Sequence, residues 1–220
     1  MLEAIVGLAV LLMSVVLHEN AHGVVALALG DDTARKSGRL TLNPVKHLDL
    51  VGSVILPAMM FFLSGSMFGY AKPVPVNPSK LQGKDRWGFA LVALAGPVSN
   101  LIIAFAAAVA ISRAYGLPAG ALRDIRFGGG DIGVVGLVPF VLLTAFSWNV
   151  LLAAFNLIPI PPLDGSRLLR VGLSANGRRT LDRIEPYGFL IIFALIVWLN
   201  EPLSRLIELI SSALVRILPV

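Results

Sequence analysis

The sequence predicts an all-α polytopic membrane protein that forms a single domain over residues 1–220. Hydrophobic residues make up 56% of the chain and charged residues only 14%, whereas a soluble domain carries roughly a quarter charged residues. The mean hydropathy is +0.83, and the apolar residues gather in segments long enough to cross a bilayer. Together these observations indicate one compact helical bundle embedded in lipid, which makes the lipid bilayer its first expected partner.

Three apolar segments form the predicted helical core, at 2–29, 87–112 and 132–158, because each is long enough to span a membrane. Over 202–218 the apolar residues recur at helical spacing and the charged residues lie elsewhere on the helix, which predicts an amphipathic helix. The segment 187–199 is also expected to be helical, although it is short for a complete span.

The apolar segment 50–69 differs from the other three because residues that break helices interrupt it, among them Gly52, Pro57, Gly65 and Gly69. This density of breakers favours a re-entrant segment, which turns back inside the membrane, over a straight transmembrane helix. Two stretches that read as extended flank it, at 39–43 and 71–77. We predict a short β-strand for each of them.

The distribution of lysine and arginine supports the re-entrant prediction. If 50–69 crossed the membrane, the basic loop residues would divide almost evenly between the two sides. If it turns back, thirteen of them lie on one side and three on the other, as the positive-inside rule requires. We therefore expect these basic loops to lie in the cytoplasm, with the N-terminus outside. The net charge of +5 then reflects membrane topology, and no nucleic-acid partner is expected.

Residues 18–22 read HENAH, inside the first apolar segment. Residues four apart lie on one face of a helix, so His18 and His22 have the spacing at which two imidazoles bind one Zn²⁺. Glu19 is rotated by about 100° from His18 and can act there as a general base on a water held by the metal. An ionisable group near the bilayer centre costs about 2.5–3.5 kcal/mol. This cost favours a metal site over a chance match to the pattern.

The third metal ligand must be a histidine, aspartate or glutamate, because the chain has no cysteine. Asp164 is the best candidate, since it follows a proline-rich stretch that ends the segment 132–158 and holds the chain rigid. The re-entrant topology places Asp164 at the same end of the bundle as His18 and His22. The alternative for Asp164 is an ordinary turn of the P-x-D-G type, and His47 is interpreted as an interfacial residue of a basic loop.

An H-E-x-x-H pentapeptide in a membrane helix, followed far downstream by NLIPIPPLDG, resembles the site-2 protease family of intramembrane zinc metalloproteases. The stretches GRLTLNPVKH, KPVPVNP and AGPVSN resemble bacterial members as well, which implies a bacterial cytoplasmic membrane. The resemblance implies one Zn²⁺ per chain, bound by His18, His22 and Asp164. It also implies that Glu19 is the catalytic base and that Asn156 steadies the scissile carbonyl or its oxyanion.

The same resemblance implies a transmembrane protein substrate that another protease has already cleaved once. Many bacterial members carry a PDZ domain between core helices, and this chain has no room for one, so it resembles a minimal type. The alternative function is that of a non-catalytic membrane metal-binding protein or metal transporter. Glu19 argues against this alternative, because a transport site has less need of a carboxylate beside the first histidine.

The segment 71–77 suggests how an unwound substrate would be bound. In a strand, Val74 and Val76 would direct their N–H and C=O groups to one edge, while Pro73 and Pro75 have no N–H to offer at the other. We therefore predict that the edge formed by Val74 and Val76 binds substrate as an added strand.

Two asparagines also stand inside apolar segments, Asn100 and Asn149. In a membrane interior, such side chains are expected to hydrogen-bond between helices.

Overall fold

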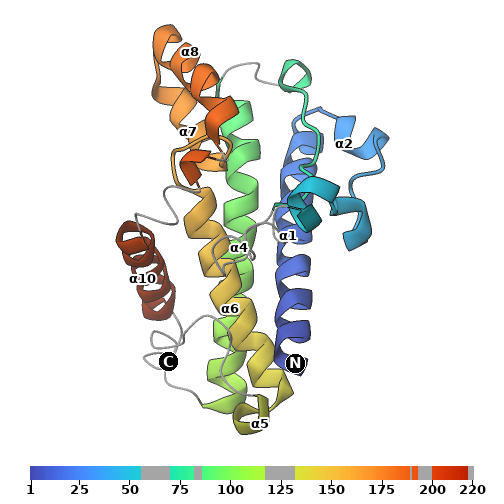
Figure 1. Cartoon of the computed structure of the whole chain (residues 1–220), viewed down its shortest axis with the longest axis vertical. Coiled ribbons are helices and arrows are strands. Elements are labelled where there is room, and N and C mark those ends of the chain that lie inside the picture. The colour runs from blue at the N-terminus through green and yellow to red at the C-terminus, as the bar shows by residue number, and fades with distance from the viewer. Residues whose placement is uncertain (56–69, 82–85, 117–131, 189, 193–199, 218–220) are drawn as a thin grey trace.

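The computed structural model describes residues 1–55, 70–81, 86–116, 132–188, 190–192 and 200–217, and these residues are all helical or irregular. Three of the described helices are long and apolar enough to cross a membrane. They are α1 (Leu2–Ala28), α4 (Arg86–Tyr115) and α6 (Leu137–Asn156). The three contact one another pairwise and run side by side along the long axis of the molecule (Figure 1), which confirms the predicted core of three membrane helices.

Small residues let α4 and α6 approach each other closely. The buried cluster between them contains three alanines of α4 together with larger side chains of α6: Ala104, Ala107, Ala108, Leu143, Phe146 and Val150. Small residues at such an interface are typical of membrane bundles, where packing rather than water exclusion drives helix association. Helix α10 (Asn200–Arg216) covers most of the predicted amphipathic segment and packs its apolar residues against this cluster. The predicted helix at 187–199 lies mostly outside the described residues.

The predicted helix at 132–158 is divided in the structure. A short helix, α5 (Ile132–Val135), precedes α6, and Gly136 between them has a φ of +83°. This left-handed backbone conformation favours glycine, which has no Cβ. After α6 the proline-rich chain leads into α7 (Asp164–Gly172) and α8 (Ala175–Ile184), followed by η5 (Glu185–Tyr187). Helices α7 and α8 lie at the end of the bundle away from the N-terminus (Figure 1).

The described residues contain no β-strand, so the strands predicted at 39–43 and 71–77 are wrong. At 39–43 the chain connects α2 (Thr33–Lys36) to η1 (Pro44–His47), and side chains occupy its polar groups. The carbonyl of Thr41 accepts hydrogen bonds from Asn20 Nδ2 at 2.8 Å and from His47 Nε2 at 3.0 Å. Asn43 caps η1 by accepting a hydrogen bond from the N–H of Val45. No ladder to a neighbouring strand is needed.

Residues 70–77, here called the strap, form neither helix nor strand, and two of their backbone N–H groups donate to carboxylates of the α1 region. The N–H of Val74 donates to Glu19 Oε2 at 2.8 Å, and the N–H of Asn77 donates to Asp31 Oδ2 at 2.6 Å. Proline stands on either side of Val74, at positions 73 and 75, and has no N–H to donate. Carboxylates distant in sequence therefore take the place of a partner strand.

The segment predicted to be re-entrant leaves and rejoins the described structure at one place. The structure follows it through η2 (Val51–Ile55), and the N–H of Tyr70 then donates to the carbonyl of Gly52 at 2.9 Å. Ser53 Oγ donates to the carbonyl of Tyr70, also at 2.9 Å. Moreover, α1 ends and α4 begins at the same end of the bundle (Figure 1), so the chain between them makes no net crossing. The course of 56–69 lies outside the described residues.

Asp31 anchors the strap to the end of α1. Its side chain is fully buried and accepts hydrogen bonds from the N–H and hydroxyl of Thr33 and from the N–H of Asn77. Burial alone would raise the pKa of Asp31, but these hydrogen bonds and the charge of Lys80 outweigh it and lower the pKa. The carboxylate form is therefore the one that the fold stabilises.

We predict that Asp31→Ala lowers the free energy of unfolding by about 1–3 kcal/mol, because it leaves buried donors without an acceptor. The effect can be measured as the shift of the unfolding midpoint in mixed detergent micelles. Because the folded-state pKa of Asp31 is lowered, its contribution is present above the unfolded-state pKa and disappears as the pH falls through the folded-state pKa.

Asp32→Ala is the matched control for this prediction. Asp32 forms ion pairs with Lys36 and Lys80 at the surface, and such pairs contribute little to stability. An equal shift for the two variants would contradict the anchoring role of Asp31.

Candidate metal centre

The two histidines of the HENAH pentapeptide lie in the second half of α1 and point into the bundle. His18 and His22 are each buried, with exposed fractions of 6% and 5%. Their rings meet edge to face, and their Nε2 atoms lie 3.1 Å apart. The helical spacing of four residues thus brings both imidazoles to one point, as the sequence predicted.

Helix α4 presents a matching stripe of three residues, Val92, Gly96 and Asn100, which are also spaced four apart. The carbonyl of Val92 lies 2.7 Å from His22 Nδ1, and Asn100 Oδ1 lies 2.6 Å from His18 Nδ1. Both partners are oxygens that accept, so each Nδ1–H donates and each Nε2 keeps its lone pair. The two lone pairs face each other across the 3.1 Å gap.

Gly96 lies at the closest approach of α4 to the histidines. A Cβ atom at this position would lie 2.5 Å from His18 Nε2 and 2.5 Å from His22 Nε2. Such a contact is far shorter than atoms tolerate. Only glycine therefore leaves room for the two Nε2 atoms and for an ion between them.

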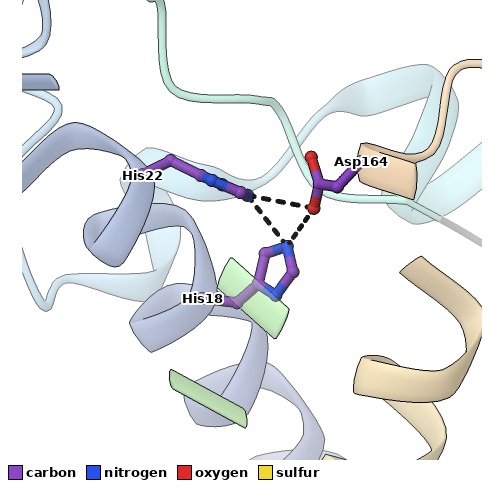
Figure 2. A group of neighbouring side chains, drawn as sticks. All are labelled: His18, His22 and Asp164. Carbon is purple, nitrogen blue, oxygen red and sulfur yellow. Dashed lines mark hydrogen bonds and ion pairs between the residues drawn. The ribbon is translucent and has the colours of Figure 1, made fainter. Parts of the chain in front are cut away.

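Asp164, the first residue of α7, reaches the histidines from the other side (Figure 2). Its Oδ2 lies 3.2 Å from His18 Nε2 and 3.2 Å from His22 Nε2. Gly165 makes this placement possible, because a Cβ there would lie 2.3 Å from the carbonyl oxygen of Leu157. The start of α7 can therefore pack closely against the end of α6. This close packing explains why glycine follows Asp164 in the sequence.

The three facing atoms form a donor set that fits a metal cation. They are 3.1–3.2 Å apart, and Asp164 Oδ2 is buried with no hydrogen-bond partner among the residues that the structure describes. Three buried lone pairs at this separation repel one another unless a cation joins them. In a tetrahedral zinc site with bonds of about 2.0–2.1 Å, neighbouring ligand atoms lie about 3.3 Å apart. Within the described residues, these three form the group able to hold a metal ion.

A cavity of about 100 Å³ opens beside the three donors. It brings together all seven residues that the sequence predicted for the site: His18, Glu19, His22, Val74, Val76, Asn156 and Asp164. Pro73, Pro162 and Arg167 also line it and were not predicted. Arg167 lies one helical turn after Asp164, and its Nη1 is 3.4 Å from Asp164 Oδ1. The sequence predicted Asp164 on a rigid, non-helical piece, whereas Asp164 begins helix α7, so the contact with Arg167 three residues later was not foreseen.

Glu19 and Asn156 are held beside the donors without joining them. Glu19 Oε2 accepts the N–H of Val74 at 2.8 Å, so that backbone group is not free to pair with an added strand. Asn156 Nδ2 donates one hydrogen to the carbonyl of Leu152 at 2.9 Å. An amide nitrogen carries two hydrogens, and within the described residues the second meets no partner.

We predict that Gly96→Ala leaves less than about a tenth of the metal bound by the wild-type protein, because the added methyl group occupies the space between the histidines. Metal content can be measured by elemental analysis of protein purified in detergent. Gly7→Ala is the matched control, since a Cβ at Gly7 in α1 meets nothing within 4 Å. Full metal content in Gly96→Ala would contradict the assigned site.

Comparison with known proteins agrees with this geometry. The chain is 39% identical over 189 residues to "Putative zinc metalloprotease YwhC" of Bacillus subtilis, a match that covers 85% of this chain and 78% of that protein. It is 33% identical over 187 residues to Rip2 of Mycolicibacterium smegmatis, which carries the same description, over 84% of this chain and 64% of that protein. Rip2 of Mycobacterium tuberculosis is 30% identical, over 88% and 66%.

No solved structure matches the chain. The profile of peptidase family M50 matches residues 6–199, which is most of the chain. The predicted membership of the site-2 protease family is thus confirmed: the chain belongs to peptidase family M50.

Proposed function

We propose that this protein is an intramembrane zinc endopeptidase, which hydrolyses a peptide bond in or near the transmembrane segment of a membrane protein. The observation that carries the proposal is the buried group of His18, His22 and Asp164, in a cavity shared with Glu19 and set among membrane helices. The names of the relatives agree with Zn²⁺ as the metal, and the donor set fits one ion per chain.

Bound at this site, Zn²⁺ would supply Lewis acidity, which makes a water acidic near neutral pH and polarises the peptide carbonyl. Glu19 takes the proton of the attacking water and passes it to the leaving amine. The N–H of Val74 holds one carboxylate oxygen of Glu19, which leaves the other oxygen to accept the proton of the water. Asn156 donates its second amide hydrogen to the oxyanion.

The proposed substrate is a transmembrane protein already trimmed by another protease. Val74 and Val76 are among the residues that line the cavity, so we propose that they contact this substrate.

Several arginines of α7 and α8 lie in the segment that begins at Asp164, among them Arg167, Arg170 and Arg178. Positive residues favour the cytoplasmic side. We therefore propose that the site faces the cytoplasm from the bacterial cytoplasmic membrane.

Glu19→Gln tests the proposed base. A glutamine oxygen can still accept the N–H of Val74, so the variant is expected to keep its shape and its zinc. Its kcat should fall by about 10²- to 10⁴-fold, because the proton acceptor is lost. The measurement is cleavage of a transmembrane substrate peptide in detergent, together with zinc content. Cleavage at the wild-type rate would refute the role of Glu19, and a metal transporter would show no cleavage in either protein.

Val74→Pro tests whether the strap positions Glu19. Proline removes the N–H that binds Glu19 Oε2, whereas Val74→Ala keeps this N–H and shortens the side chain. A hydrogen bond to a charged group contributes about 1.5–3 kcal/mol, so kcat in the proline variant should fall about ten- to a hundredfold below that of the alanine variant. Zinc content should be equal in the two. Equal kcat values would show that the strap does not position the base.

A further inference from the structure

A continuous chain of buried hydrogen bonds leads from His18 into the bundle, and it crosses all three membrane helices. Beyond His18, Asn100 Nδ2 of α4 donates to Asn149 Oδ1 of α6 at 2.7 Å. Asn149 Nδ2 donates to Ser14 Oγ of α1 at 2.8 Å and to the carbonyl of Ala145 at 2.8 Å. Ser14 Oγ in turn donates to the carbonyl of Val10 at 2.9 Å. Asn100 and Asn149 have no exposed surface.

The direction of this chain is fixed at its far end, because a backbone carbonyl can only accept. Ser14 gives its single hydrogen to Val10, so it accepts from Asn149. Asn149 uses both amide hydrogens, on Ser14 and on Ala145, so its oxygen must face Asn100. Asn100 therefore donates to Asn149 and turns its own oxygen toward His18.

We propose that Asn100 and Asn149 are positioning residues that fix the tautomer of His18 for metal binding. Because Asn100 offers only an oxygen, His18 must carry its hydrogen on Nδ1 and direct the lone pair of Nε2 at the metal position. The backbone carbonyl of Val92 accepts the Nδ1 hydrogen of His22 and so fixes the same tautomer there directly. A backbone acceptor thus sets each tautomer, one directly and one through three side chains.

The flipped orientation of the Asn100 amide is unfavourable for two reasons, one at His18 and one at Asn149. With its NH₂ group toward His18, Asn100 would favour the tautomer with hydrogen on Nε2, which removes the metal-binding lone pair. It would also bring its oxygen against Asn149 Oδ1, and two buried acceptors facing each other have a large unfavourable energy. Asn149 hydrogen-bonds to Asn100 and not to His18. Its effect on the tautomer of His18 is therefore transmitted through Asn100.

The test is the zinc affinity of the full chain in detergent, measured by competition with a chelator. Asn100→Leu and Asn149→Leu should each weaken zinc binding by about 10- to 100-fold. The double variant should bind no more weakly than Asn100→Leu alone, because both substitutions break one pathway. Ser147→Ala is the matched control on α6: it removes a buried hydroxyl that donates to the carbonyl of Leu143 in its own helix, and zinc affinity should not change.

Asn149→Asp keeps the test valid if the leucine variants fail to fold. A protonated aspartate can donate to Ala145 and still offer an oxygen to Asn100, so the direction of the chain survives and zinc affinity should stay within about threefold of wild type.

Nitrogen NMR of the three labelled histidines supplies a second readout. In the zinc-loaded wild type and in Asn149→Asp, His18 should show a protonated Nδ1 with a slowly exchanging hydrogen. In Asn149→Leu and Asn100→Leu that hydrogen should exchange rapidly.

The inference rests on the proposed metal site, and the outcomes separate the two. If the wild type binds no zinc, the proposed function itself fails. If the wild type binds zinc and the leucine variants bind it equally well, or if the two losses add in the double variant, the positioning role of the asparagines is overturned while the metal site stands.

Discussion

Three electron-pair donors face one another inside an apolar bundle, and the rest of the structure depends on this arrangement. His18, His22 and Asp164 come from two helices far apart in sequence, and their facing atoms are 3.1–3.2 Å apart. Such a cluster is stable in a membrane only if a cation joins it and each ligand is held by a second partner. The glycines at 96 and 165 provide the clearance, and α4 provides the acceptors that keep both Nε2 lone pairs free.

The strap connects this centre to the surface of the bundle. Its backbone is held at Val74 by Glu19 and at Asn77 by Asp31, and both carboxylates belong to α1 or the turn that follows it. The same element that carries the two histidines therefore positions the strap over the cavity. In the proposed reaction Glu19, the base, is held by the N–H of Val74 while it accepts the proton of the water. The same hydrogen bond therefore serves both the stability of the strap and catalysis.

Much of the site could be predicted because its signals are local. The spacing of His18 and His22 requires only helical periodicity, and the breakers within 50–69 led to the topology that brings Asp164 to them. The strands at 39–43 and 71–77 were predicted wrongly because alternation cannot reveal that Glu19, Asp31 and Asn20 occupy the backbone groups. The roles of Gly96 and Asn149 depend on distances between helices, which a single sequence does not contain.

X-ray absorption at the zinc edge, measured on the purified wild-type protein, tests whether His18, His22 and Asp164 bind zinc. We expect one zinc per chain with nitrogen and oxygen ligands at about 2.0–2.1 Å, and outer-shell scattering from two imidazoles. The chain has three histidines, so scattering from three imidazoles would place His47 at the metal and contradict this ligand set. Scattering from one imidazole, or protein that binds no zinc, would contradict it as well.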